Sequence, residues 1–98
     1  MKIRILSETS FQITEQSDKY LDTYEYHFDR GIIEVAKSCY PEVRDQGFRI
    51  MVFVRGMYTH KNDSILRADV QDMPHIIEAL KRFCRFNEES FEIEPCIL

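Results

Sequence analysis

The segment from Gly47 to Gly56 is the most apolar run of the chain, and it constrains the fold more than any other stretch. β-Branched and aromatic residues dominate it, which is typical of a β-strand. Because alternate residues of a strand point to opposite faces, one face carries only the apolar residues Phe48, Ile50, Val52 and Val54. The other face is apolar in the middle and charged at its ends, with Arg49, Met51, Phe53 and Arg55. This pattern predicts a strand inside a sheet.

Length, charge and cysteine content limit the class of protein. The 98 residues predict a single domain that spans residues 1–98. Acidic residues outnumber basic ones by 17 to 13, which argues against general binding to phosphate backbones. The first residues form too short an apolar run for a secretory signal, and no run approaches the roughly 20 apolar residues that span a bilayer. The odd, widely spaced set of Cys39, Cys84 and Cys96 favours a reducing, cytoplasmic location.

Three further segments alternate apolar and polar residues as strands do. Residues 2–6 form the first of them. Residues 10–14 either extend that strand or pair back onto it. Residues 64–71 place Leu66, Ala68 and Val70 on an inner face, and they are predicted to return along the central apolar run after a polar hairpin loop.

The C-terminal part of the chain has the clearest local signals. From Met73 onward the apolar residues recur at helical spacing, Asp72 is a plausible N-cap, and Pro74 falls in the first turn, where its missing N–H matters little. This predicts a helix. Residues 91–94 then alternate as a last strand, and Pro95 indicates that this strand lies at a sheet edge or ends there.

Residues 18–40 fit two patterns. With a period of 3.6, their apolar residues form one continuous stripe, which predicts a helix, although Gly31 costs about 1 kcal/mol inside one. The alternative is a strand to Phe28, a turn over residues 29–31, and a helix only over residues 32–39. We expect the full helix, because its stripe persists along the whole segment.

The resulting order is strand, helix, strand, strand, helix, strand, and it resembles the ferredoxin-like split β-α-β-β-α-β arrangement. The resemblance implies an α+β fold, with a four-stranded antiparallel sheet and two helices on one face. It also predicts charged neighbours on the open sheet face, with Lys2 and Arg4 next to Glu92 and Glu94 on one side and next to Arg67 and Asp69 on the other.

An acidic row is the first candidate binding surface. Its residues share one face of the expected helix, and two exposed tyrosines extend it: the row consists of Asp18, Asp22, Glu25 and Asp29, with Tyr20 and Tyr26. Tyrosine offers a large, rigid contact area with a polar tip. These six residues are predicted to bind a partner protein, such as one whose basic groove normally holds nucleic acid. A solvated surface with no partner is the plainer interpretation.

A second candidate surface is the middle of the open sheet face, where Met51, Phe53 and Ile65 form an apolar spot among charges. Exposed apolar spots mark interaction sites, so these residues are a candidate homodimer interface.

Signals for catalysis are missing from the sequence. His27, His60 and His75 share no metal-ligand spacing, the glycines are isolated, and no nucleophile motif occurs. We therefore expect no cofactor, no metal and no enzymatic activity. The leading hypothesis is a protein-interaction module that acts as a regulator or inhibitor, for example a phage- or mobile-element-type inhibitor of a nucleic-acid-handling complex. The alternative is a small-molecule-binding or enzymatic domain with a pocket between the sheet and the helices.

Overall fold

The computed structural model describes residues 1–15, 23–38, 49–54, 57–58 and 65–95. In these residues the chain is α+β, as predicted, with one helix and eight strands. In chain order the elements are β1 (Lys2–Ser7), β2 (Ser10–Glu15), β3 (Tyr24–Phe28), β4 (Gly31–Ser38), β5 (Arg49–Val54), β6 (Met57–Tyr58), β7 (Ile65–Arg67), α1 (Met73–Phe86) and β8 (Glu92–Pro95).

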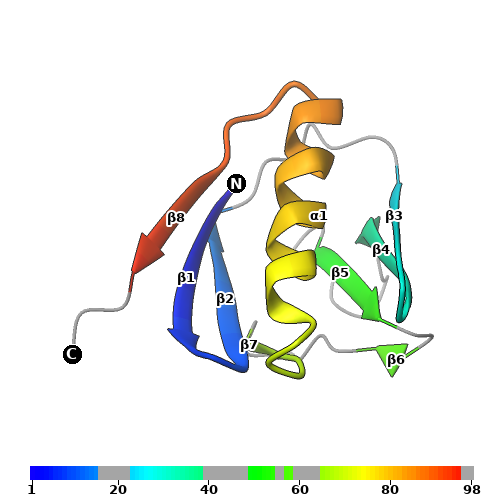
Figure 1. Cartoon of the computed structure of the whole chain (residues 1–98). Helices are drawn as coiled ribbons and strands as arrows, with labels where there is room; N and C mark the ends of the chain where they lie inside the picture. The colour runs from blue at the N-terminus through cyan, green and yellow to red at the C-terminus, as the bar shows by residue number, and fades with distance from the viewer. Residues whose placement is uncertain (16–22, 39–48, 55–56, 59–64, 96–98) are drawn as a thin grey trace.

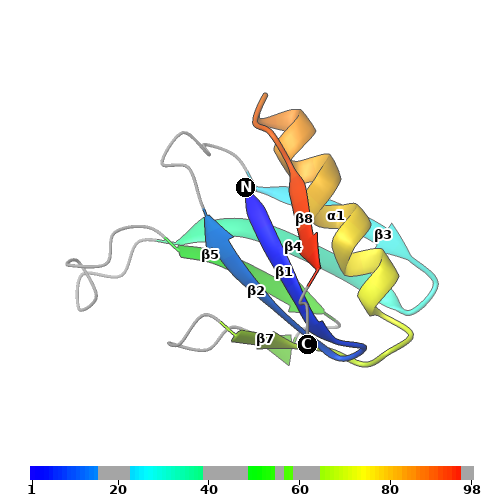
Figure 2. The same cartoon turned by 90° about the vertical axis from the view of Figure 1, so that its left-hand side faces the viewer.

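The strands form two four-stranded sheets, with the orders β7-β2-β1-β8 and β3-β4-β5-β6. The first sheet is mixed, because β1 runs antiparallel to β2 and parallel to β8. The second sheet is antiparallel throughout. The helix α1 lies between β8 of the first sheet and β3 of the second (Figures 1 and 2). The predicted ferredoxin-like arrangement, with one antiparallel sheet and two helices, is therefore wrong for the described residues.

The first sheet confirms the alternation seen in the sequence. β2 pairs back onto β1, with Ile3 opposite Ile13, so the interpretation of residues 10–14 as an extension of the first strand is wrong. Ile3, Phe11 and Leu66 are buried on the inner face. The strand predicted over residues 64–71 is shorter, covering β7 only, and it pairs with β2.

The expected helix over residues 18–40 is not formed by its described part, where β3 and β4 make a hairpin. Phe28 pairs with Gly31, which leaves a two-residue turn between them. Gly31 has φ of 138°, a conformation that a Cβ atom would disfavour. Burial also alternates with a period of two, since Ile33 and Val35 are buried while Ile32 is exposed. The alternative interpretation was right about the strand and the turn but wrong about a helix after Gly31.

The central apolar run forms β5, which lies inside a sheet as predicted. Its neighbours are β4 and β6. The predicted hairpin between this run and residues 64–71 is wrong, because β7 belongs to the other sheet. Periodicity identified the strand correctly, but it contained no information about which strand would pair with it.

The helix α1 confirms the prediction, with Asp72 at the N-cap and Pro74 in the first turn. Its inner side and the inner faces of both sheets form one hydrophobic core. The largest fully buried side chains of this core are Phe11, Phe83, Ile3, Ile33, Leu66, Ile76, Leu80, Val35 and Cys84. α1 contributes to the same core as both sheets. This shared packing fixes the position of α1 relative to the edge strand β8.

Candidate functional site

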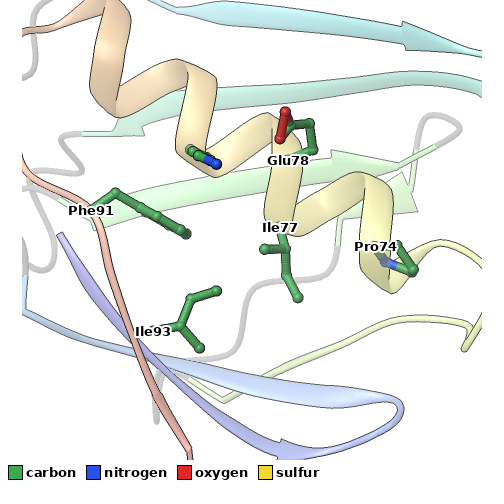
Figure 3. Close-up of a pocket in the computed structure, with 6 residues that line it drawn as sticks. Pro74, Ile77, Glu78, Phe91 and Ile93 are labelled. Atoms are coloured by element: carbon green, nitrogen blue, oxygen red, sulfur yellow. The ribbon is translucent and has the colours of Figure 1, made fainter.

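A groove of about 400 Å³ runs between α1 and β8. Its lining residues are Pro74, Ile77, Glu78 and Lys81 of α1 with Phe91 and Ile93. Figure 3 shows Ile77, Phe91 and Ile93 pointing toward one another across the groove, while Glu78 points away from it. Ile93 is 49% exposed, so the floor of the groove is an apolar surface that solvent reaches.

The helix supplies its wall of the groove through residue spacing. Residues three and four apart lie on one helical face, so Pro74, Ile77 and Lys81 follow one another along the side of α1 toward β8. The neighbouring stripe, which includes Ile76, Leu80 and Phe83, is buried in the core. The apolar face of α1 is therefore wider than the core requires, and its margin forms the groove.

The other wall is the edge of a sheet. β8 ends the order β7-β2-β1-β8, and the Glu92 N–H donates to the Met1 carbonyl at 3.0 Å. In a parallel pair, a residue directs both its backbone groups to one neighbour and the next residue directs its groups the other way. Glu92 and Glu94 thus face β1, whereas the N–H and C=O of Ile93 point outward. Pro95 follows on the outward side and has no N–H to offer.

The outer face of β8 carries two acidic side chains that are paired with β1. The ammonium group of Lys2 lies 3.8 Å from the Glu92 carboxylate, and Arg4 donates to Glu94 at 3.1 Å. This confirms the prediction that these four charges are neighbours. The predicted contact of Lys2 and Arg4 with Arg67 and Asp69 is wrong, because β2 lies between β1 and β7.

Charges also flank the groove on the helix. The Glu78 carboxylate forms an ion pair with Arg82, which lies one turn further along α1, and its Oε1 is 3.5 Å from Nε of Arg82. A side-chain hydrogen bond with Tyr24 raises the pKa of Arg82 above its usual value, and the negative charge of Glu78 adds to this. The Glu78–Arg82 pair therefore places one negative and one positive charge beside the groove. Lys81 is exposed at the rim.

The opposite side of α1 is filled rather than open. The hydroxyl of Tyr26 is hydrogen-bonded to Nδ1 of His75 at 3.1 Å, and the Phe28 ring lies 4.7 Å from the His75 ring. The Arg82 guanidinium lies 5.1 Å from the centre of the Tyr26 ring. These aromatic contacts pack α1 against β3 on this side of the helix.

The predicted acidic row does not form a single helical surface. Glu25 lies on the exposed face of β3, where its carboxylate is 3.3 Å from Nε2 of His27, and Asp29 is in the following turn. Tyr26 is half-buried, and its hydroxyl is hydrogen-bonded to His75 of α1. The remaining members, Asp18, Tyr20 and Asp22, lie outside the described residues. The argument from a shared helical face is lost, and partner binding by these residues stays a prediction.

The predicted homodimer face is divided between the two sheets. Met51 and Phe53 belong to β5 of the second sheet, whereas Ile65 belongs to β7 of the first. The expectation that one open sheet face displays all three is therefore wrong. Dimer formation itself stays a prediction.

The described histidines and cysteine have structural surroundings. His75 packs against the Tyr26 and Phe28 rings, His27 is paired with Glu25, and Cys84 is buried in the core. Within the residues that the structure describes, no group of three or more His, Cys, Asp or Glu side chains is placed to hold a metal ion. The described helix, α1, lacks the length and apolar content needed to span a bilayer.

Sequence reasoning missed the groove although it found parts of its walls. The sequence predicted the helix that contains Ile77 and the strand that contains Phe91 and Ile93. Pro95 correctly indicated an edge strand. No sequence signal showed that α1 would lie beside that edge and leave Ile93 accessible.

Comparisons of the chain with protein-family models, with curated proteins and with solved structures return no match. The proposals below therefore rest on the residues of this chain alone.

Proposed function

We propose that this chain is a protein-interaction module that binds a segment of a partner protein in the groove between α1 and β8. The observation that carries the proposal is the position of an apolar groove directly beside β8, whose outer edge pairs with no other strand among the described residues. Ile77, Phe91 and Ile93 offer apolar surface, and the outward N–H and C=O of Ile93 offer hydrogen bonds. A polypeptide segment satisfies both, because it brings apolar side chains and backbone partners together.

Such a module acts by holding or covering its partner, which is the regulator or inhibitor role expected from the sequence. A partner with a basic surface remains part of the proposal, now because of Glu92 and Glu94 on β8. The narrower hypothesis of a phage- or mobile-element-type inhibitor rested on the acidic row of a helix, and the described residues add no support for it.

A random-peptide display library, selected on the immobilised full chain, tests the proposal. We expect the selected peptides to lose affinity for the variant Ile93→Lys by at least about tenfold, since a buried contact of this kind is worth more than about 1 kcal/mol. The matched control is Val70→Lys. Val70 lies beyond the end of β7 and is exposed, 56% accessible, so its predicted place on the inner face is wrong, and it does not line the groove. Its substitution should change the Kd by less than about twofold.

Two results would overturn the proposal. One is a selection that yields no peptide with groove-dependent affinity. The other is a set of peptides that bind both lysine variants as tightly as the unsubstituted chain, which would place the binding site elsewhere. A groove that instead binds a small apolar acid, and no peptide, would support the ligand-binding alternative against the present proposal.

A further inference from the structure

The exposed edge of β8 limits which partner segments can bind more closely than the groove alone does. We infer that the partner segment adds to the first sheet as a further β-strand along β8, and that its sequence alternates basic, apolar and basic residues. This inference rests on the proposed function, because it names the kind of partner that the same groove accepts. Three features of β8 lead to it.

The first feature is the backbone. Ile93 directs its N–H and C=O away from β1, so an extended segment can pair with it as a neighbouring strand does. Pro95 cannot donate to such a ladder, and β8 itself covers only Glu92–Pro95. The pairing therefore extends over a short motif centred on Ile93.

The second feature is the difference between the two faces of β8. Ile93 lies over the groove, beside Ile77 and Phe91, so the central residue of an added strand meets an apolar floor. Glu92 and Glu94 lie on the opposite face, where β1 places Lys2 and Arg4 next to them. Because cross-strand neighbours of opposite charge stabilise a sheet, basic residues are favoured on both sides of the central apolar one.

The pairing of β1 with the other edge of β8 already shows the proposed basic–apolar–basic pattern. β1 pairs with β8 residue by residue, with Lys2 opposite Glu92, Ile3 opposite Ile93, and Arg4 opposite Glu94. Ile3 is fully buried in this pairing. A basic–apolar–basic strand thus satisfies one side of β8, and the same three side chains of β8 are presented to the free side.

The third feature is the acidic pair Glu92 and Glu94, which argues against a second copy of this chain as the added strand. Two copies related by a twofold axis pair antiparallel through the same patch, so pairing about Ile93 places Glu92 opposite Glu94 of the other copy. Like charges directly opposite each other destabilise a strand pair. The acidic pair therefore disfavours self-association along β8 and favours a basic strand from another protein.

The test uses three capped peptides, titrated into the ¹⁵N-labelled full chain and followed by NMR. The peptide Thr-Lys-Ile-Arg-Thr carries the expected pattern, Thr-Glu-Ile-Glu-Thr reverses its charges, and Thr-Lys-Ser-Arg-Thr removes the apolar residue. We expect the first to bind at least about tenfold more tightly than either control, since two charge pairs and one apolar contact separate them. The amide signals of residues 91–94 should shift.

Two substitutions at Ile93 separate strand addition from side-chain contact. Ile93→Ala removes the side chain but keeps the outward N–H, whereas Ile93→Pro removes the N–H as well, at an edge position where proline leaves the pairing with β1 intact. We expect Ile93→Pro to weaken binding by at least a further factor of about ten relative to Ile93→Ala. The dispersion of the NMR spectrum shows whether each variant is folded.

The double substitution Glu92→Lys/Glu94→Lys provides a second test that does not alter the backbone. It should reverse the preference, so that Thr-Glu-Ile-Glu-Thr binds more tightly than Thr-Lys-Ile-Arg-Thr. If display-selected peptides bind the groove but tolerate Ile93→Pro as well as Ile93→Ala and show no preference for basic residues, strand addition is wrong while the proposed function stands. If no peptide depends on the groove, both are wrong.

Discussion

At the scale of single residues, the Asp72 side chain makes a tertiary contact in place of the helix-capping hydrogen bond that its position in the sequence suggests. It occupies the N-cap of α1 without a side-chain capping hydrogen bond. Its Oδ1 instead lies 2.8 Å from Nε of Arg30 in the β3–β4 turn. Both atoms are buried and form an ion pair rather than a well-aligned hydrogen bond, while Nη2 of Arg30 donates to Oδ2 of Asp72 at 3.4 Å. Arg30 also donates to Asp69 at 3.2 Å, so one guanidinium joins the hairpin turn to the start of the helix.

The substitution Arg30→Ala tests this connection. It leaves the Asp72 carboxylate, whose side chain is only 4% exposed, without its cation, and we expect the free energy of unfolding to fall by about 2 kcal/mol. The control Arg85→Ala removes an exposed charge from the last turn of α1 and should cost less than about 1 kcal/mol. Urea unfolding followed by circular dichroism measures both. Equal losses in the two variants would show that the Arg30–Asp72 contact is not stabilising.

At the scale of elements, α1 owes its place to one apolar side. The helix buries Ile76, Leu80 and Phe83 completely, while its last residue, Phe86, is 56% exposed beside the Tyr24 ring. The two phenylalanines are three residues apart, yet one is part of the core and the other covers its margin. Their side chains therefore report separately on the buried core and on its exposed margin.

Alanine substitution at each phenylalanine tests this orientation. Phe83→Ala should lower the free energy of unfolding by about 3–5 kcal/mol, because it leaves a cavity in the shared core. Phe86→Ala should cost at most about 1.5 kcal/mol, the value of one aromatic pair with little burial. Chemical unfolding of both variants under one set of conditions gives the comparison. Similar losses at the two positions would contradict the orientation of α1.

At the scale of the whole molecule, one core joins the two sheets. Ile3 and Phe11 of the first sheet and Ile33 and Val35 of the second belong to the same buried cluster as the helix. Neither sheet has a separate core among the described residues. The prediction that residues 1–98 form a single domain can therefore be tested as a question of cooperativity.

We expect both sheets to unfold in one transition. Far-UV circular dichroism reports on the backbone, and intrinsic fluorescence reports on the five tyrosines of the chain, of which Tyr24 and Tyr26 pack against the core. The two signals should give the same midpoint in urea, as two-state domains of this size do. Separate midpoints, with the tyrosine signal changing first, would show that the second sheet and α1 unfold independently of the first sheet.

Much of the local structure was predictable because its determinants are neighbours in the sequence. A cap position, an early proline and a continuous apolar stripe identified α1. Alternation identified β1, β2 and β8, and Pro95 indicated an edge. The described part of residues 18–40 was misassigned because its apolar residues satisfy both a helical and an alternating pattern, and the positive φ of Gly31 distinguishes the two only in the folded chain.

The sequence by itself determined which segments of this chain have an apolar face and which strand ends in a proline at an edge. Only the tertiary structure decided that β5 and β7 lie in different sheets and that α1 leaves a groove beside β8. The physical reason is that periodicity depends on residues a few positions apart. Strand pairing and shared burial instead depend on contacts between residues far apart in the chain, such as Ile3 with Ile93.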